Sequence, residues 1–392
     1  MDLTRSPAGG ALPRSGSGAP TPRACVAASR RVLRTVLAAL ATLTPLLGLG
    51  ACGGDERERV AVLITADEAA ARPVLAAFER ATGIRVDATF VPEATDTATL
   101  LGLLRSPGDR PRADVLWSAD LLQTIRLAES GAAAPLRSAA ADAWPPALRD
   151  PEGRWFAFAA RAGVIAYAPE RVAEHEVPTA WTDLVRDWWR GRIAMPDPRA
   201  GMTAGQLGAM KAYWDREFMP GYYGAFLEGL RENEIRVLPT GSAVIEAIAS
   251  GEADAGMTDS AALRAAQARG VAIAGVAARH DPDEATGGGG AFLLPSAVAL
   301  LAGSSSPALA ARFIDFMLSP EVELLLLEAS APRIPLRPDR LPASAATLLD
   351  GVAVADPLRA RASAVLEQME SASAAATRLL GSERTPPPSP DR

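Results

Sequence analysis

The sequence predicts an α/β protein with two lobes and largely parallel sheets, on three observations. From residue 60 onward, short apolar runs alternate with amphipathic helical patterns, as expected for strand–helix–strand units. The chain has 392 residues, 48% of them hydrophobic, which is enough for one or two complete cores. Two long extended stretches, 156–167 and 291–301, lie far apart in the sequence, and a hinge between two lobes needs such paired crossings.

The first strand–helix unit begins at Val60. The continuous apolar run 60–64 predicts a strand that is buried on both faces. Thr65-Ala66-Asp67 then favours a helix start. That helix is expected to end at Gly83, because glycine readily adopts the left-handed conformation that terminates a helix. A second strand, Ile84–Phe90, follows at once.

Later units repeat this pattern. Ala113–Trp117 is the next buried strand, and Ser118 and Asp120 can cap the helix that follows it and ends near Gly131. Further strands are predicted at Gly163–Tyr167, Arg192–Met195, Ile235–Leu238, Ala253–Met257 and Val271–Val276, and helices at Pro307–Leu318 and Glu321–Glu328. The four glycines at 287–290 either enter the second crossing or form a surface loop.

Residues 1–51 are predicted to be an export signal of the lipoprotein type, preceded by a disordered extension. Three arginines between 30 and 34 precede an apolar run, 36–49, which is shorter than the roughly 20 residues of a spanning helix. The run ends at Leu49-Gly50-Ala51-Cys52, which resembles a bacterial lipobox, so Cys52 is the expected lipidation site. A cleaved signal with a coincidental cysteine is the alternative. A weak twin-arginine match at 29–33 leaves the export route open.

Composition and motifs argue against two other classes of protein. The net charge is −6 and the basic residues are scattered, so we expect no nucleic-acid binding. The sequence holds no GxSxG, HExxH or P-loop motif, and its two histidines are His175 and His280. We therefore expect a protein that is not an enzyme.

Five blocks that occur in order between residues 60 and 336 carry a family resemblance. They are Arg112–Ser118, Asp150–Arg161, Trp181–Pro196, Gly251–Asp259 and Ile314–Glu321. They resemble the blocks ADVFWS, DPDGRW with AAR, SLxDLxxPxWKGRVxxxxP, GExxxGLTD and IDYLLSPE of the iron(III)-type branch of bacterial extracellular solute-binding proteins. The resemblance implies the type II periplasmic-binding-protein fold, a Venus-flytrap in which two lobes with mixed, mostly parallel sheets are joined by a hinge.

The resemblance also implies an organisation and a role. We expect an N-terminal lobe of 58–160 plus 288–330, a C-terminal lobe of 161–287 plus 331–380, and a disordered tail at 381–392. The expected function is the substrate-binding lipoprotein of an ABC importer: a monomer at the periplasmic or cell-surface face of a membrane that passes a small solute to a permease. A ligand-sensing lipoprotein partner of a membrane signalling protein would have the same fold. A periplasmic enzyme is the third alternative.

The candidate ligand-binding residues lie where strands meet helix N-termini, which offer free N–H groups to ligands. They are Thr65, Ser118, Ala119, Asp120, Gly201, Thr203, Gly241, Ser242, Thr258 and Asp259. The alternative is that these residues are ordinary N-caps. Arg161 matches a cleft-facing arginine of the family and is expected to hold a carboxylate, phosphonate or synergistic anion. A structural salt bridge to a hinge carboxylate is its alternative role.

The identity of the solute stays open between ferric iron with a synergistic anion and a small anionic organic molecule. The family's ferric members use a tyrosine pair, which here aligns with Ala261-Ala262, so that Asp120 and Asp259 remain as candidate metal ligands. Tyr222-Tyr223 is expected to pack within a helix. The acidic segment that starts at His280-Asp281 is expected to be a solvated surface loop. No resident cofactor is predicted.

Overall fold

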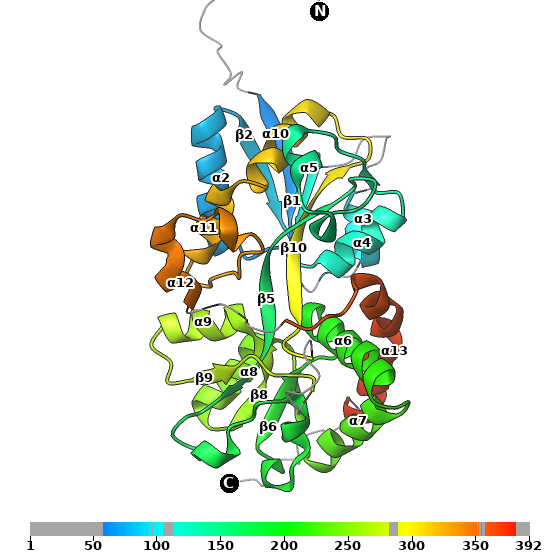
Figure 1. Ribbon diagram of the computed structural model, residues 1–392, viewed down its shortest axis with the longest axis vertical. Helices are drawn as coiled ribbons and strands as arrows, with labels where there is room; N and C mark the ends of the chain where they lie inside the picture. The colour runs from blue at the N-terminus through cyan, green and yellow to red at the C-terminus, as the bar shows by residue number, and fades with distance from the viewer. Residues whose placement is uncertain are drawn as a thin grey trace, which may run out of the picture. The chain divides into compact units, whose positions relative to one another are not determined.

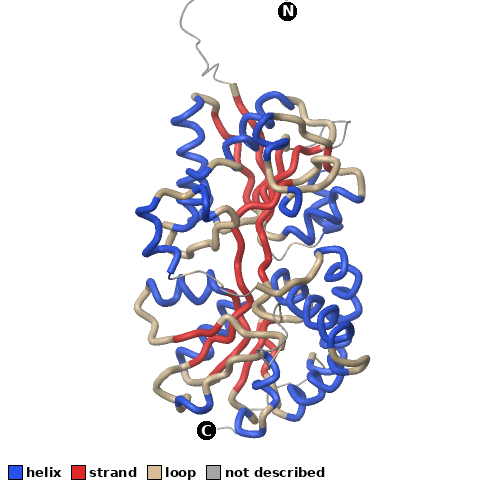
Figure 2. The backbone as a smooth tube through the Cα atoms, viewed as in Figure 1, coloured by secondary structure: helices blue, strands red, loops and turns tan. Residues whose placement is uncertain are grey.

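Ten strands of the described part of the chain form one mixed sheet that runs through both lobes (Figure 2). The computed structural model describes residues 58–381, apart from 94, 96, 105–112, 282–288, 351, 353, 355 and 356. The strand order is β2 (Arg85–Phe90), β1 (Arg59–Ile64), β3 (Val115–Ser118), β10 (Leu293–Leu301), β5 (Phe156–Tyr167), β8 (Ala255–Asp259), β6 (Ile193–Pro196) and β7 (Arg236–Leu238). Two short strands lie off this path, β4 (Ala133–Ala134) on β10 and β9 (Ala274–Val276) on β5.

The first lobe forms as its sequence pattern predicts. β1 pairs in parallel with β2 and β3, and all of its apolar side chains except that of Ala61 are fully buried. Asp67 caps α2 (Glu68–Thr82) by accepting the N–H of Ala69, and Gly83 ends this helix at φ 73°. The other helices of the lobe are α3 (Thr97–Leu104), α4 (Leu121–Glu129), α5 (Ala139–Ala143), α10 (Pro307–Met317) and α11 (Pro320–Leu327).

The second lobe repeats the parallel arrangement around β6, which pairs with β7 and β8. Three tryptophans, Trp181, Trp189 and Trp214, fill its core. Its helices are α6 (Gly201–Glu217), α7 (Tyr222–Glu232), α8 (Gly241–Ser250), α9 (Ser260–Ala268) and α13 (Ala362–Leu380). The short helix α12 (Ala346–Asp350) is drawn next to α11 in Figure 1. The predicted strands and helices are confirmed, with boundaries that shift by a few residues.

The C-terminal helix α13 packs along α6 (Figure 1). The two helices approach closely at Gly208, where an added Cβ would lie 2.9 Å from Cα of Met369 and 2.9 Å from the carbonyl oxygen of Val365. Ser373 of α13 also donates a hydrogen bond of 2.7 Å to the carbonyl of Pro198, just before α6. The position of α6 therefore depends on the end of the chain.

The two long strands β5 and β10 run side by side between the lobes (Figure 1). The first part of β5 pairs with β10, and from Gly163 onward β5 pairs with β8 and β9 instead. This change of partner lies close to the lobe boundary predicted at 160–161. A bulge interrupts the β5–β10 ladder, because Ala160 faces Pro295 whereas Phe158 faces Ser296. The skipped residue, Ala159, has φ 44°, a value that is rare for a residue with a Cβ.

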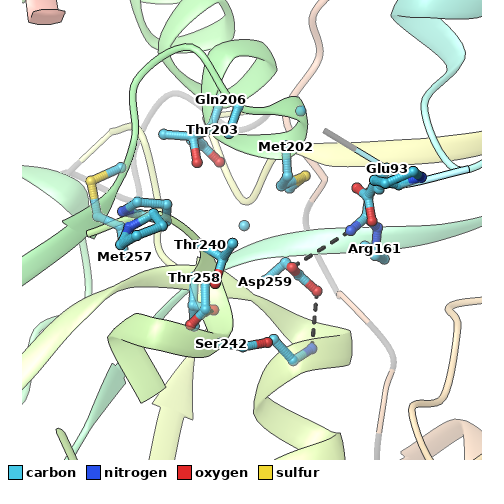
Figure 3. Close-up of a pocket in the computed structure, with 18 of the residues that line it drawn as sticks. Glu93, Arg161, Met202, Thr203, Gln206, Thr240, Ser242, Met257, Thr258 and Asp259 are labelled. Atoms are coloured by element: carbon cyan, nitrogen blue, oxygen red, sulfur yellow. Dashed lines mark hydrogen bonds and ion pairs between the residues drawn. The ribbon is translucent and has the colours of Figure 1, made fainter. Parts of the chain in front are cut away.

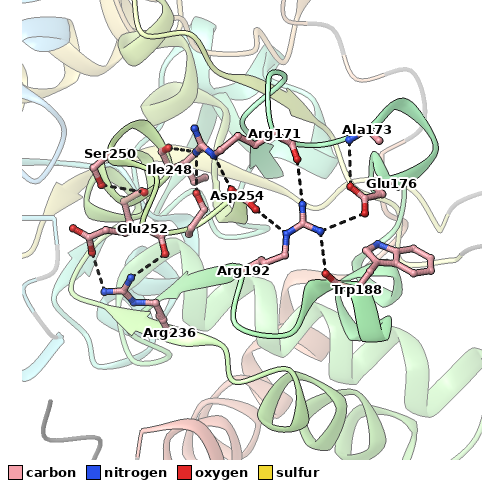
Figure 4. A network of polar contacts seen from close by, with 12 residues as sticks. Arg171, Ala173, Glu176, Trp188, Arg192, Arg236, Ile248, Ser250, Glu252 and Asp254 are labelled. Carbon is pink, nitrogen blue, oxygen red and sulfur yellow. Dashed lines mark hydrogen bonds and ion pairs between the residues drawn. The ribbon is translucent and has the colours of Figure 1, made fainter. Parts of the chain in front are cut away.

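An ion-pair network connects the amino ends of β6 and β8 (Figure 4). The carboxylate of Asp254 accepts hydrogen bonds of 2.7 Å from Arg171 and 2.7 Å from Arg192, and Arg192 also pairs with Glu176. Arg192 and Asp254 belong to two of the blocks that carry the family resemblance. In this structure they join the amino ends of the two strands. A ligand is expected at the opposite, carboxyl ends.

Candidate ligand-binding site

A cavity of about 360 Å³ lies at the carboxyl ends of β6 and β8, where α6, α8 and α9 begin (Figure 3). Residues from the segment after β2, the middle of β5 and the second lobe line it. Seven candidate residues are among the lining residues: Arg161, Gly201, Thr203, Gly241, Ser242, Thr258 and Asp259. The sequence analysis missed several others, among them Glu93, Gly163, Trp181, Gln206 and Met257, whereas Thr240 belongs to the predicted loop that also holds Gly241 and Ser242.

Arg161 forms the charged side of the cavity (Figure 3). This residue is 4% exposed, and its guanidinium pairs with Glu93 and lies 3.6 Å from the carboxylate of Asp259. Burial lowers the pKa of Arg161, but the charges of Glu93 and Asp259 outweigh burial and raise that pKa above its ordinary value. Arg161 is therefore charged and already paired with two carboxylates.

Four other candidates, Thr65, Ser118, Ala119 and Asp120, lie together but do not line the cavity. The hydroxyl of Thr65 accepts the N–H of Ala119 at 3.0 Å, and the hydroxyl of Ser118 accepts that of Asp120 at 3.1 Å. The carbonyl of Ala119 accepts a 3.3 Å hydrogen bond from Arg161. The structure thus brings the four residues together behind Arg161, where they help to position it.

Asp120 caps a helix in this group. Its carboxylate accepts the N–H groups of Leu122 at 2.7 Å and Gln123 at 3.2 Å, at the start of α4. Burial is the largest influence on Asp120 and raises its pKa. Asp259, the second candidate metal ligand, caps α9 by accepting the N–H groups of Ala261 at 2.9 Å and Ala262 at 3.1 Å.

The hydroxyl groups of the cavity differ in their availability. Thr240 caps α8 by accepting the N–H of Ala243 at 3.1 Å, and Thr258 donates to the carbonyl of Gly241 at 3.3 Å. The hydroxyls of Thr203 and Ser242, in contrast, make no hydrogen bond to another described residue. Thr203 reaches toward the middle of the cavity from α6, opposite Thr240 and Thr258 (Figure 3). Thr203 and Ser242 can therefore bind a solute at no cost in protein hydrogen bonds.

The prediction of a solvated loop at His280-Asp281 is wrong. His280 has no exposed surface, and Asp281 is 2% exposed. The backbone N–H of His280 donates to Gly289 at 2.7 Å, and its ring bonds Gln206 and Gly290. Backbone hydrogen bonds from His280 and Asp281 to Gly289 hold this segment in the protein interior. Its acidic composition does not predict that burial. The rest of the acidic run and the first two glycines lie outside the described residues.

The helix prediction for Tyr222-Tyr223 is confirmed. The hydroxyl of Tyr223 donates to the carbonyl of Ala372 in α13 at 2.9 Å, and Tyr222 stacks on Phe218 with ring centroids 5.0 Å apart. Burial raises the pKa of Tyr223, which disfavours the phenolate that a hard metal ion prefers. Within the described ranges, no group of three or more His, Cys, Asp or Glu side chains is placed to hold a metal ion.

None of the helices in the described part of the chain is long and apolar enough to cross a membrane. Cys52 and the tail after residue 381 lie outside the described residues.

Comparisons with known proteins agree with the fold. Residues 60–328 match the model of a family described as bacterial extracellular solute-binding protein. Iron uptake protein A1 of Synechocystis is 30% identical over 182 residues, 46% of this chain and 48% of that protein, so the match spans about half of the relative's length.

Two solved structures share the fold. Iron-bound HitA from Pseudomonas aeruginosa superposes with a TM-score of 0.66 at 22% identity, over 81% of this chain and 99% of that one. The periplasmic binding protein AfuA from Actinobacillus pleuropneumoniae, with fructose-6-phosphate bound, gives a TM-score of 0.66 at 17% identity, over 83% and 99%. At these identities the two structures establish the two-lobe periplasmic-binding fold.

Proposed function

This chain belongs to the bacterial extracellular solute-binding proteins, and from that premise we propose that it captures a small organic anion and delivers it to an ABC importer. The surroundings of Arg161 carry the proposal. Carboxylates from both lobes, Glu93 and Asp259, meet this one buried guanidinium beside a cavity of about 360 Å³. A solute bound there touches both lobes at once only when they are closed, so binding favours the closed form.

Two features favour an anionic group on the solute. The amino ends of α6 and α8 face the cavity with Gly201 and Gly241, so the positive ends of two helix dipoles meet there. The unpaired hydroxyls of Thr203 and Ser242 stand beside those ends and can donate to carboxylate or phosphate oxygens.

Ferric iron with a synergistic anion is the second candidate solute. Iron uptake protein A1 and iron-bound HitA give this candidate weight by their names. In this chain, however, Ala262 lines the cavity at a position where the ferric members have one of their paired tyrosines, and Asp259 is paired with Arg161. AfuA binds an organic phosphate on the same fold. We therefore favour the organic anion.

The proposal extends to location and organisation. The lipobox-like Leu49–Cys52 supports a lipid anchor at Cys52, which would hold a monomer at the periplasmic or cell-surface face of a membrane. We place the lobe divisions where they were predicted, at 160–161, 287–288 and 330–331. A sensor lipoprotein that reports solute binding to a membrane signalling protein has the same fold. Loss of solute uptake on deletion of the chain separates the importer from the sensor.

Native mass spectrometry of the full chain purified from its own membrane fraction tests solute capture. Ser242 lines the cavity on an exposed helix end, so Ser242→Trp fills the cavity without disturbing the core. Ser250→Trp, at the other exposed end of α8, is the matched control. We expect wild type and Ser250→Trp to carry the same small adduct and Ser242→Trp to lack it. An adduct retained by Ser242→Trp, or a folded wild type without any adduct, contradicts the proposal.

A further inference from the structure

Two buried polar atoms of residues that line the cavity have no partner among the described residues. They are the indole nitrogen Nε1 of Trp181, a donor, and the side-chain oxygen Oε1 of Gln206, an acceptor. Both residues line the cavity, and they are 0% and 2% exposed. Buried polar atoms are nearly always hydrogen-bonded, because an unpaired one carries the full cost of its lost hydration. Their shared position therefore indicates a place for a ligand group.

These atoms come together beneath β5 at Gly163. A Cβ added at Gly163 would overlap Oε1 of Gln206 and would lie 3.3 Å from Cζ2 of Trp181, the atom two bonds from the indole nitrogen. Glycine at this position thus leaves room for the amide oxygen of Gln206 against the strand. The indole of Trp181 also packs edge-on against the ring of His280, with centroids 6.4 Å apart.

His280 sets the orientation of the Gln206 amide. Nδ1 of His280 lies 2.7 Å from the carbonyl oxygen of Gly290, which can only accept, so Nδ1 carries the proton. Burial lowers the pKa of His280 to about 4, so the ring is neutral at neutral pH and its Nε2 is an acceptor.

Gln206 must then present its NH2 group to that nitrogen, at 2.7 Å. The amide oxygen of Gln206 is then left without a partner among the described residues, close to Gly163. The hydrogen-bond chain Gly290–His280–Gln206 therefore decides which atom of the amide a solute meets.

We propose that Gln206 and Trp181 form a subsite for one hydroxyl group of the solute, that His280 is its positioning residue, and that the solute class is a hydroxylated organic anion. This inference rests on the proposed function and makes it more specific. A hydroxyl accepts from Trp181 and donates to Gln206 at once, and it satisfies both atoms. A hydrogen in its place leaves both unpaired, and sites built to bond a hydroxyl discriminate strongly against such analogues.

Position within the cavity agrees with this class of solute. Glu93 and Arg161 lie at one side, Met257 lies at the opposite side, and Thr203 lies between them (Figure 3). An anionic group near the amino ends of α6 and α8 leaves the remainder of a small molecule within the cavity. Gln206 and Trp181 are both among the residues that line this space.

Calorimetric titration with paired probes tests the subsite. The pairs are malate and succinate, citrate and tricarballylate, and glycerol 3-phosphate and propyl phosphate, whose second members lack hydroxyl groups. In the wild-type full chain we expect at least one hydroxylated member to bind tenfold or more tighter than its partner. Gln206→Met and Trp181→Phe should each reduce this ratio to below about threefold while the deoxy partner binds as before.

Matched controls separate a specific effect from a general one. Gln267→Met in α9 and Trp188→Phe, whose indole is exposed, lie outside the cavity lining and should keep the wild-type ratio. His280→Asn can bond Gly290 but does not reach Gln206, so it should lose the ratio. His280→Gln reaches both and should restore it. A purely structural role for His280 would instead weaken both members of each pair equally.

Three results overturn the subsite. The first is equal affinity for both members of every pair in the wild type. The second is a ratio that survives in Gln206→Met and Trp181→Phe. The third is that no hydroxylated probe binds the wild type with a Kd below about 1 mM. None of these results tests solute capture itself. Solute capture is tested separately, by the adduct that native mass spectrometry detects in the wild type and not in Ser242→Trp, without any added probe. If Gln206→Met does not fold, Trp181→Phe alone tests the donor half.

Discussion

Nη1 of Arg161 lies 3.6 Å from Oδ2 of Asp259, and the other end of the same guanidinium pairs with Glu93. Arg161 belongs to β5, which passes between the lobes, whereas Asp259 ends β8 in the second lobe and Glu93 follows β2 in the first. One buried cation therefore joins cavity residues from both lobes. The sequence left two roles open for Arg161, ligand binding and a structural salt bridge. The two are compatible, because the salt bridge to Asp259 is also part of the cavity wall.

Replacing Arg161 with Met should lower the free energy of unfolding by about 3 kcal/mol, because it leaves Asp259 and Glu93 without their partner in a largely buried place. Urea denaturation measures the loss. Arg137→Met is the control, since its pair with Asp142 is exposed on both sides and should change stability by less than about 0.5 kcal/mol. Equal small losses in the two variants would show that Arg161 is not held by this pair.

Acid should destabilise the protein through His280. Burial lowers the pKa of His280 to about 4, below its ordinary value of 6.5. As the pH falls from 6.5 to about 4, the unfolded chain gains a proton at His280 that the folded protein does not take, so stability falls over this window by up to about 3 kcal/mol.

The variant His280→Asn has no such proton to bind. Its unfolding free energy should therefore depend less on pH between 4 and 6.5 than that of the wild type, as measured by denaturant titration at each pH. His175→Asn, at an exposed position, should keep the wild-type slope. A wild-type slope in His280→Asn means that His280 is not buried in its neutral form.

The bulge at Ala159 should tolerate glycine. A φ of 44° is unfavourable for alanine because of its Cβ, and glycine does not have this cost. Ala159→Gly should therefore leave the free energy of unfolding unchanged or raise it by up to about 1 kcal/mol. Ala157→Gly, at a regularly paired position of the same strand, should lower it by about 1 kcal/mol. Thermal or urea unfolding compares the two. A larger loss at Ala159 than at Ala157 would argue against this backbone conformation.

The Asp254 network should affect stability and not solute capture. Burial raises the pKa of Asp254, but hydrogen bonds from Arg192 and Arg171 outweigh burial and lower that pKa below its ordinary value. The network therefore stabilises the folded protein above about pH 4, and this stabilisation is lost as the pH falls further. Asp254→Asn should lower the free energy of unfolding by about 2 kcal/mol at pH 7.

The same variant should retain the small adduct in native mass spectrometry, because Asp254 lies at the amino end of β8. Glu252→Gln, whose pair with Arg236 is exposed, is the control and should cost less than about 0.5 kcal/mol. Loss of the adduct in Asp254→Asn would mean that this end of the sheet is coupled to the cavity.

Local patterns predicted much of the fold and part of the site. Asp67 and Gly83 mark the ends of α2, because capping and left-handed termination depend on residues that are adjacent in sequence. Seven of the candidate residues line the cavity for the same reason, since each lies at or near a helix start that follows a strand or on β5 itself.

The remaining features depend on contacts between distant segments. Gln206 sits among apolar residues of α6, and only the return of residue 280 to the core gives its amide a partner. Two polar residues three positions apart on that helix face, Thr203 and Gln206, were the available signal. Likewise, Glu93, in the loop after β2, meets Arg161 in the middle of β5, and no periodicity in the sequence indicates this contact.

The packing of α13 on α6 also constrains how the protein is made. A chain that is synthesised from its amino end releases α6 well before α13. Until α13 has formed, Gly208 and the apolar face around it stay uncovered and open to aggregation. Because α6 also begins at the cavity, the cavity wall reaches its final packing only after the last described helix has been made.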